Sequence, residues 1–433
     1  MRSRSSFPVP NPKDFKEALG AWSKTYSEIV WLDSNGHRQS YASYDLILGL
    51  DRQTDKSKFS LNSIDEINHF IEERKDWLFG YFSYDFKNQL EDLASHNFDG
   101  LNFPEIHFFQ PSKIIAVEKD QVHFFYLDSV ADQMKKDHAE IMAMTRMQKQ
   151  ESEAQQAVRI KIRIHKDAYF EKIKRLLGHI HRGDVYEANF CQEFYAEDTL
   201  IDPWETYQRL NSISEPPFAA FMKLDDKYLM CASPERYLKK EGQTVISQPI
   251  KGTAPRGNTK IEDQRIKERL QIDEKERAEN IMITDLVRND LSKSALKGSV
   301  KVEELCGVYA YKQVHQMIST VTCQVPKDKN PLELILETFP MGSMTGAPKI
   351  SAMRIIEELE ETKRGLYSGA AGYFDPEGNF DFNVVIRSIL YNATTKYLSF
   401  SVGSAITAKS EPEKEYQECL LKAKAMRNVL EAS

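Results

Sequence analysis

The sequence predicts an α+β fold in which strands and helices occur in separate runs and pack as layers. Strand-like segments follow one another between Ser27 and Val130, and the second half of the chain holds runs of helical segments and strand pairs. Strict alternation of strands and helices would instead favour a parallel α/β sheet. With 433 residues, the chain is long enough for two or three folding units, or for one large core with a smaller companion.

The first part of the chain is predicted to consist of short apolar strands. EIVWLDSNG and WLFGYFSYD have strand composition, and the runs KIIAVEK and QVHFFYL, split by Asp120, predict a β-hairpin. A polar, glutamine-rich stretch follows from Asp132 to Gln156 and is typical of either a solvated helix or a tether. We place a boundary there, between an N-terminal region at residues 1–150 and a second region at residues 160–433.

The second region is predicted to open with an amphipathic helix in HKDAYFEKIKRLLGHIHRG, which Gly183 ends. Strands are expected around AAFMKLDDKYLMCAS, GQTVISQPI and HQMISTVTCQV, and strand pairs around GAAGYFD, FNVVIRSILYN and YLSFSVGSAIT. Helices are expected at about residues 260–291, 331–338 and 348–361, and a last helix at the C-terminus. Ser410, Pro412 and Glu413 predict a capping box where that last helix begins.

Composition and charge exclude several classes of protein. Hydrophobic residues at 41% and charged residues at 28% are typical of a globular protein, and a net charge of -7 argues against a general nucleic-acid binder. No apolar run reaches the roughly 18 residues needed to cross a bilayer, and no apolar segment follows the N-terminal arginines. Five scattered cysteines without a CxxC pair favour neither disulfides nor zinc. We therefore expect a cytoplasmic protein that binds neither membrane nor nucleic acid.

Two pairs of glutamates on predicted helices are candidate metal ligands. Glu276 and Glu279 lie three residues apart in DEKERAENIMITDLVRND, and Glu415 and Glu418 have the same spacing in SEPEKEYQECLLKAKAM. Carboxylate pairs from two helices can converge on a hard cation such as Mg²⁺, which prefers oxygen ligands. Taken alone, each pair is also typical of a solvated helix face, because exposed glutamates are common.

Lys251 stands between an isoleucine and a glycine in PIKGTAPR, at the end of the apolar-alternating run TVISQPI. A strand end that turns through glycine can display one reactive side chain, or can let an ordinary lysine reach water. The loop FPMGSMTGAPK runs into a predicted helix, where free N–H groups suit an anion. It lacks the GxxxxGK[ST] pattern, so it is not a nucleotide P-loop.

Four single residues stand out, and each can be explained without a function. Arg387, inside the apolar strand run FNVVIRSIL, needs an anionic partner, which can be a structural ion pair or a substrate carboxylate. His315, in a strand-like run, suits the core as well as a catalyst, and Tyr367, among small residues, can line a pocket or simply pack. Glu235 follows a proline at a strand end, where a lone glutamate is usually exposed.

Nine segments, in unbroken order from about Gly183 to Met426, together resemble the chorismate-utilising enzymes. This family comprises anthranilate synthase large subunits, aminodeoxychorismate synthase component I and isochorismate synthases. The segments are GDVYEANFCQEF, ASPERYL, QPIKGTAPRG, DEKERAENIMITDLVRNDL, VHQMISTVTC, PMGSMTGAPKISAM, RGLYSGAAGYF, FNVVIRSI and GSAIT…EPEKEYQECLLKAKAM. WLDSNG and WLFGYFSYDF resemble the family more loosely. The resemblance implies two packed, mainly antiparallel β-sheets that form a sandwich flanked by helices, with the active site between the sheets.

The resemblance also implies a role for each candidate residue. Four glutamates would hold Mg²⁺ against the ring carboxylate of chorismate: Glu276, Glu279, Glu415 and Glu418. Other groups would bind the substrate and its carboxylates: Thr253, Ser343, Tyr367, Arg387, Gly403 and Lys422. The catalytic groups would be Lys251, Glu235 as the general acid for the C4 hydroxyl, and His315 near the reacting ring. Gly403-Ser404-Ala405 departs from the G-x-G pattern that the family often shows there.

The lysine distinguishes between branches of the family. In anthranilate synthases the corresponding stretch looks like PIAGT, which leaves room for ammonia to attack C2 of chorismate. In aminodeoxychorismate synthases it looks like PIKGT; the lysine amine attacks C2, and ammonia then enters at C4 and expels it. Lys251 therefore favours the aminodeoxychorismate branch, which makes a folate precursor. Anthranilate synthase, isochorismate synthase and a non-catalytic metabolite-binding subunit are the alternatives.

Two requirements follow from this chemistry. A free lysine has a pKa of ~10.4, so the attacking amine has to lose its proton; desolvation favours the loss, while nearby glutamates oppose it unless a metal screens them. The ammonia also needs a source. No cysteine of the chain stands in a nucleophile-elbow context, so the resemblance implies a separate glutamine amidotransferase subunit.

Overall fold

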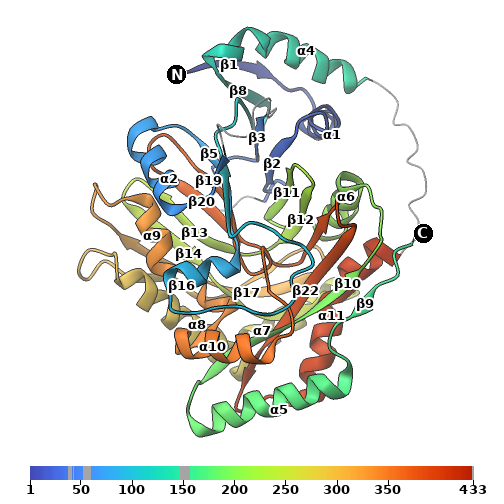
Figure 1. Ribbon diagram of the computed structural model, residues 1–433, viewed down its shortest axis with the longest axis vertical. Helices are drawn as coiled ribbons and strands as arrows, with labels where there is room; N and C mark the ends of the chain where they lie inside the picture. Colours follow the sequence, from blue (N-terminus) through green and yellow to red (C-terminus); the bar gives the residue numbers. More distant parts are fainter. Residues whose placement is uncertain (38–40, 42, 52–59, 147–156, 432–433) are drawn as a thin grey trace.

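The computed structural model describes residues 1–37, 41, 43–51, 60–146 and 157–431, and it shows two β-sheets with helices around them (Figure 1). Every strand pairing within the two sheets is antiparallel. The α+β class and the paired sheets expected from the sequence are therefore confirmed.

The first sheet has 12 strands, and the N-terminal strands join the later ones where β2 pairs with β11. Its order is β1 (Arg2–Pro8), β8 (Gln121–Leu127), β7 (Lys113–Glu118), β3 (Leu46–Asp51), β2 (Glu28–Asp33), β11 (Phe218–Leu224), β12 (Lys227–Ser233), β21 (Ser388–Asn392), β22 (Tyr397–Thr407), β10 (Glu187–Ala196) and β18 (Gly346–Ala347), with β9 (Lys161–Ile162) also paired to β10. The predicted hairpin is confirmed as β7 and β8.

The second sheet has 10 strands. Its order is β15 (Ile250–Pro255), β17 (Val314–Gln324), β14 (Thr244–Gln248), β13 (Arg236–Glu241), β20 (Phe380–Val384), β19 (Ala370–Phe374), β5 (Leu78–Phe82), β6 (Ile106–Phe109) and β4 (Ser60–Leu61), with β16 (Lys301–Ala310) also paired to β17. Strands from before and after the predicted boundary therefore share both sheets. The stretch where we placed that boundary lies partly outside the described residues.

Eleven helices in the described part of the chain surround the sheets. They are α1 (Pro12–Ser23), α2 (Ile64–His69), α3 (Lys87–Leu90), α4 (Met134–Met144), α5 (Lys166–Arg182), α6 (Pro203–Ser214), α7 (Lys260–Ile272), α8 (Glu274–Ser292), α9 (Pro331–Thr338), α10 (Lys349–Leu359) and α11 (Pro412–Glu431). None of these described helices has the length and apolar content needed to cross a membrane.

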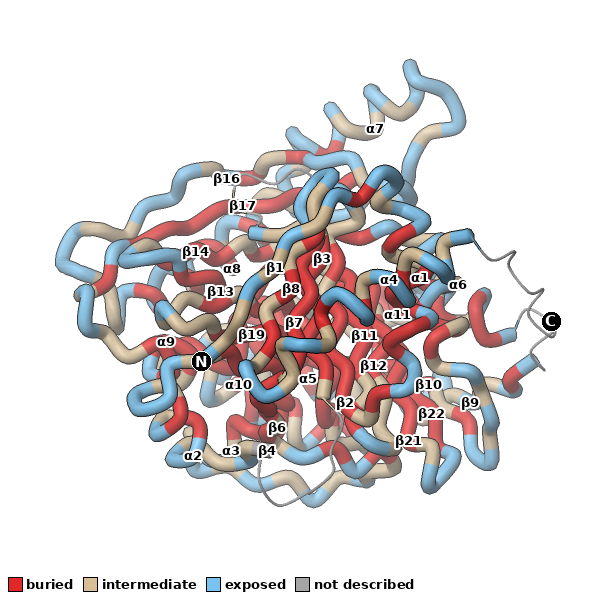
Figure 2. Tube along the Cα trace, turned by 90° about the horizontal axis from the view of Figure 1, so that it is seen from above, coloured by how far each residue is buried: buried red, intermediate tan, exposed pale blue. Residues whose placement is uncertain are grey.

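Two apolar layers hold the fold together. One joins buried residues of both sheets, for example Met222 and Leu229 of the first sheet with Phe82 and Phe382 of the second. The other joins the first sheet to α1, α5, α6 and α11. Figure 2 shows the buried strands at the centre, whereas α7 projects from the edge as a largely exposed helix.

Two helix predictions need correction. The expected helix at 260–291 is two helices, because Asp273 ends α7 and its side chain caps α8 by accepting from the backbone N–H groups of Lys275 and Glu276. The capping box at Ser410 does not form: its hydroxyl accepts from Thr407 N, and Glu413 pairs with Lys166 at 2.7 Å. The start of α5 and its end at Gly183, which has φ +87°, agree with the prediction.

Candidate active site

Lys251 lies at an irregularity in β15. Pro249 separates β14 from β15, and the pairing of β15 with β17 shifts register between Ile250 and Thr253. Gly252 has φ +97°, and a Cβ there would lie 3.3 Å from a carboxylate oxygen of Glu276. The lysine is therefore inside the strand at a bulge, and not at the strand end that the sequence suggested. Its side chain is only 13% exposed.

The Lys251 amine faces a carboxylate from the opposite sheet. Nζ lies 3.2 Å from Oε1 of Glu187, the first residue of β10, and the Glu187 side chain is only 2% exposed. The second oxygen, Oε2, is buried without a hydrogen-bond partner among the described residues. Burial lowers the pKa of the Lys251 amine, but the surrounding carboxylates, led by Glu187, outweigh burial and raise it above its ordinary value. The ion pair joins the two sheets at this point.

Helix α8 is fixed against the lysine strand by Asn280. The buried Asn280 amide donates to the carbonyl oxygen of Lys251 at 3.0 Å and to that of Met317 at 3.1 Å. Its neighbour Glu279 and the preceding Glu276 are thereby held beside β15, and the Glu279 charge raises the pKa of Lys251. The helical spacing predicted from the sequence thus brings both carboxylates to the lysine.

Helix α11 supplies the second pair of glutamates. Glu415 is buried, and Glu418 lies close enough to Glu276 for its charge to raise the pKa of that carboxyl. Burial and neighbouring charges, foremost Glu276, raise the pKa of Glu279 to about 7, even though Lys251 and Lys275 lower it. The carboxylates of α8 are therefore short of positive charge.

The donor chemistry of the four glutamates fits a hard cation. Carboxylate oxygens are the ligands that Mg²⁺ prefers. Burial is the main cause of the raised pKa of Glu276 and Glu279 and neighbouring carboxylates add to it, and a cation between the two helices would offset both effects. In the described part of the chain, no three acidic, histidine or cysteine side chains form a group ready to hold a metal ion. Metal binding by these residues therefore stays a prediction.

Glu235 is buried, in contrast to the exposure that its sequence context suggested. It lies between β12 and β13 and is 4% exposed. Burial raises the pKa of its carboxyl to about 7, although the Ser343 hydroxyl, Lys251 and Arg387 each lower it. A carboxyl that is half protonated near neutral pH suits a general acid.

Arg387 also differs from its prediction. It lies between β20 and β21 with φ +51°, and not inside a strand. In the described structure its guanidinium forms no ion pair. Burial lowers the pKa of the guanidinium, and the negative charge of Glu235 partly opposes this effect. A half-buried guanidinium without a fixed partner suits a substrate carboxylate better than a structural ion pair.

Three further predicted residues, Tyr367, Gly403 and Lys422, are connected to one another and to Glu418. The hydroxyl of the buried Tyr367 lies 3.8 Å from Cys191 Sγ, and the same sulfur packs against Gly403, where a Cβ would come within 2.5 Å of it. Lys422 donates to the Gly403 carbonyl at 2.9 Å and pairs with Glu418 at 2.6 Å. Gly403 is therefore required by close packing, and its carbonyl group holds the Lys422 amine of α11 beside Glu418.

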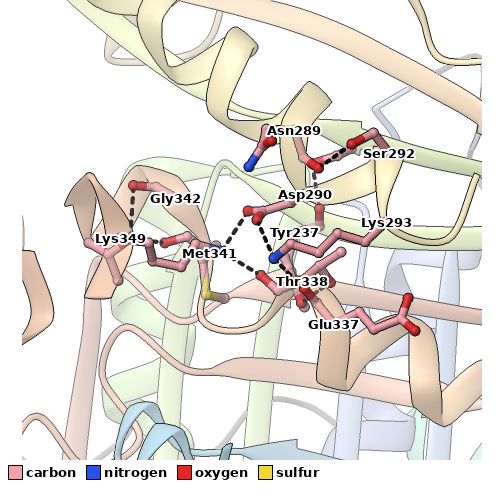
Figure 3. Close-up of polar contacts among 12 residues, drawn as sticks. Tyr237, Asn289, Asp290, Ser292, Lys293, Glu337, Thr338, Met341, Gly342 and Lys349 are labelled. Carbon is pink, nitrogen blue, oxygen red and sulfur yellow. Dashed lines mark hydrogen bonds and ion pairs between the residues drawn. The ribbon is translucent and has the colours of Figure 1, made fainter. Parts of the chain in front are cut away.

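The loop with Ser343 is held in place by a buried ion pair (Figure 3). Lys349, at the start of α10, pairs with Asp290 of α8 at 2.6 Å and donates to the Thr338 carbonyl at 2.9 Å. The Thr338 hydroxyl in turn lies 2.6 Å from that of Tyr237. These contacts join helix α8, the Ser343 loop and the strand after Glu235.

His315 and Thr253 are placed less centrally. His315 is buried in β17, where Nε2 lies 2.8 Å from Asp263 of α7 and Nδ1 has no hydrogen-bond partner among the described residues. Thr253 is exposed on β15. Within the described structure, no hydrogen bond or ion pair joins either side chain to Lys251. Their roles stay predictions from the resemblance.

Comparison with known proteins identifies the family. Residues 27–428 match the family described as chorismate binding enzyme. The chain belongs to this family. It is 31% identical over 377 residues to aminodeoxychorismate synthase component 1 of Bacillus subtilis, with 85% of this chain and 80% of that protein covered. It is 34% identical over 358 residues to anthranilate synthase component 1 of Thermus thermophilus, with 81% and 77% covered.

The fold is shared with a solved isochorismate synthase. The crystal structure of the menaquinone-specific isochorismate synthase of Escherichia coli superposes with a TM-score of 0.77 at 17% identity, covering 99% of this chain and 95% of that one. This confirms the fold and leaves the choice among the family's reactions to the residues of the site.

Glu187 is the one residue of this candidate site to which the sequence analysis assigned no role. It stands in the segment GDVYEANF, which was used for the resemblance as a whole. The available signal was a glutamate at the start of an apolar strand run, where a buried charge requires a partner. Its partner Lys251 belongs to the other sheet, so the pairing became visible only in the folded chain.

Proposed function

We propose that this chorismate-binding enzyme is the large component of an aminodeoxychorismate synthase, which converts chorismate and ammonia to 4-amino-4-deoxychorismate. The observation that carries the proposal is the Lys251 amine, buried between the two sheets and surrounded by the glutamates of α8, α11 and β10. Anthranilate chemistry needs only room for ammonia at that position. A lysine held there is suited to attack the ring itself.

The residues of the site can each perform one part of this reaction. The Lys251 Nζ lone pair forms a bond to C2 of chorismate while the C4–oxygen bond breaks, and Glu235 gives its proton to the departing hydroxide, so that water leaves. Ammonia then bonds to C4 and the C2–nitrogen bond breaks, which returns the amine. The pKa of Glu235, about 7, supports its role because both proton donor and acceptor forms are populated near neutral pH.

One side chain would position the substrate and one ion would assist. Arg387, which has no fixed ion pair in the described structure, would bind a substrate carboxylate. Mg²⁺ would be held by the glutamates of α8 and α11, where it would neutralise the ring carboxylate of chorismate and their own repulsion.

The ammonia would come from a glutamine amidotransferase subunit. All five cysteines are buried, and burial raises the pKa of the Cys191 thiol to about 12 and that of Cys231 to about 11. Inert thiols of this kind do not hydrolyse glutamine. The name "component 1" of the Bacillus subtilis relative also supports a two-component enzyme.

Product identification tests the proposal. The chain is incubated with chorismate, Mg²⁺ and ammonium, and products are separated by chromatography with and without a lyase that converts 4-amino-4-deoxychorismate to 4-aminobenzoate. We expect lyase-dependent 4-aminobenzoate. Fluorescent anthranilate or isochorismate would instead assign the chain to another branch of the family, and no consumption of chorismate would indicate a binding subunit.

The covalent step has its own test. Protein quenched after reaction with chorismate and Mg²⁺, without ammonia, should carry added mass on the peptide that contains Lys251. The variant Lys251→Ala should carry none. An unmodified peptide from wild-type protein that turns over chorismate when ammonium is added would contradict nucleophilic attack by this lysine.

A further inference from the structure

Glu187 is placed to receive a proton from Lys251. Among the described residues it is the one carboxylate within 4 Å of the Lys251 amine, and both side chains are withdrawn from solvent, with exposures of 2% and 13%. Water is therefore a poor acceptor for the ammonium proton in this position. The orphaned oxygen Oε2 of Glu187 is buried as well, so the carboxylate has an acceptor site that the folded chain leaves unused.

Backbone pairing fixes Glu187 on both sides. In β10 it is paired with Thr407 of β22 and with Ala347 of β18, directly before α10. A carboxylate on the first residue of a strand would otherwise be free to turn to solvent. Its position between two paired strands keeps it directed at the opposite sheet, and this is the arrangement required of a residue that positions another group.

We propose that Glu187 is the residue that positions the Lys251 amine and accepts its proton before the attack on chorismate. This inference rests on the proposed function, because it concerns the nucleophile of that reaction. One proton moves from Nζ to a Glu187 oxygen, which leaves a neutral amine and a neutral carboxylic acid. The nitrogen lone pair then forms the bond to C2, and the hydroxide that leaves C4 takes its proton from Glu235.

The energetics of burial favour this transfer. A charged pair out of water is costly, whereas the neutral pair formed by the transfer is not. The other carboxylates around the lysine oppose the transfer, because they hold the amine charged, and a cation that neutralised them would allow it. Other carboxyl groups also act on the lysine: Glu276 and Glu279 from α8, Glu418 from α11, and Glu235 before β13. They act from longer range, and no ion pair within 4 Å joins any of them to Nζ in the described structure.

The test compares three variants in single-turnover formation of the Lys251 adduct, measured by intact mass after quenching with chorismate and Mg²⁺ present and ammonia absent. Glu187→Gln keeps the shape and removes the acceptor, while Glu187→Asp keeps a carboxylate that is one methylene shorter. Glu193→Gln is the matched control: it removes another buried carboxylate of β10, one that is paired with Arg163 at 2.9 Å and does not contact the lysine. Rates are measured from about pH 6 to about pH 10, and circular dichroism checks folding.

We expect Glu187→Gln to form the adduct about 100-fold more slowly at neutral pH, the usual contribution of a positioned base. Its rate should rise by about tenfold per pH unit, because the fraction of neutral lysine rises in the same proportion, until the pH reaches the pKa of the lysine. Glu187→Asp should recover part of the rate, and Glu193→Gln should keep the wild-type pH profile. The aspartate variant tests the proposal even if the glutamine variant does not fold, because its shorter carboxylate should make adduct formation slower than in wild type without abolishing it.

Two results would overturn the inference, and they are distinguishable. Folded Glu187→Gln protein with the wild-type rate and pH profile would show that Glu187 is only structural, and the proposed function would stand. Wild-type protein that makes 4-amino-4-deoxychorismate without any adduct would remove the lysine nucleophile, and the role of Glu187 with it.

Discussion

The buried carboxyl of Glu235 gives the sharpest quantitative prediction. Its pKa is raised from 4.5 to about 7, chiefly by burial, a difference of roughly 2.5 pH units or about 3 kcal/mol. At pH 7 about half of the molecules should therefore carry the protonated acid, whereas an ordinary glutamate would be protonated in about one molecule in 300. Glu235→Gln mimics the protonated form permanently and is the perturbation of choice.

The sign of the stability effect follows from the direction of this shift. Because the folded-state pKa is raised, the folded protein binds a proton that the unfolded chain has already lost between about pH 4.5 and pH 7. The contribution of Glu235 is complete below about pH 4.5 and is lost as the pH rises to about 7. Relative to wild type, Glu235→Gln should therefore gain about 3 kcal/mol of stability across this interval.

Two measurements check this reasoning. Infrared difference spectra between wild type and Glu235→Gln should show a carboxylic-acid band that titrates near pH 7. Melting temperatures of both proteins, compared at about pH 5 and about pH 8, should diverge in favour of the variant at the higher pH. An acid band that is already lost when the pH is raised to about 5.5, or a melting difference that does not change with pH, would show that burial does not hold this carboxyl protonated near neutral pH.

Three further predictions concern other parts of the site. Glu415→Gln should weaken Mg²⁺ binding, measured by calorimetry, by about tenfold or more, whereas Glu413→Gln, an exposed glutamate on the same helix, should leave it unchanged. Arg387→Gln should raise the KM for chorismate about 30-fold through loss of about 2 kcal/mol of charge-assisted binding, and an unchanged KM would contradict its role. Lys349→Met should destabilise the protein by about 2 kcal/mol in urea unfolding because it leaves the buried Asp290 with the half-exposed Lys293, at 3.2 Å, as its remaining ion-pair partner among the described residues, and Lys349→Met with Asp290→Asn should recover part of the loss.

Local patterns in the sequence were enough to predict the layers of the fold. The hairpin β7–β8 and the helix α5 rest on alternation and on helical spacing, which are properties of neighbouring residues. The division of the helix at Asp273 was missed because helix-forming residues continue on both sides, and only the folded backbone shows which side chain caps α8. Likewise, the turn at Arg387 interrupts an apolar run that reads as one strand.

Burial was the harder property to predict in the site. Helical spacing predicted that Glu276 and Glu279 share a face, and the structure brings that face to Lys251. The sequence around Glu235 suggested an exposed side chain, because nothing in a strand end reveals what packs over it. Glu187 was missed for the same reason: its partner is supplied by the other sheet, and contacts between sheets leave no local pattern.

The balance of charge explains why this site would need a cation in addition to its lysines. Among the described residues, the cluster holds six carboxyl groups and four basic ones: Glu187, Glu235, Glu276, Glu279, Glu415 and Glu418 against Lys251, Lys275, Arg387 and Lys422. Chorismate carries two carboxylates, so its binding would add negative charge to a cluster in which carboxyl groups already outnumber basic groups. Burial, with a smaller contribution from Glu276 and Glu187, already raises the pKa of Glu279. A divalent ion would offset that surplus, and its positive charge would also disfavour the protonated form of a lysine amine beside it. The same ion that permits the substrate to bind would thus favour transfer of the lysine proton to Glu187.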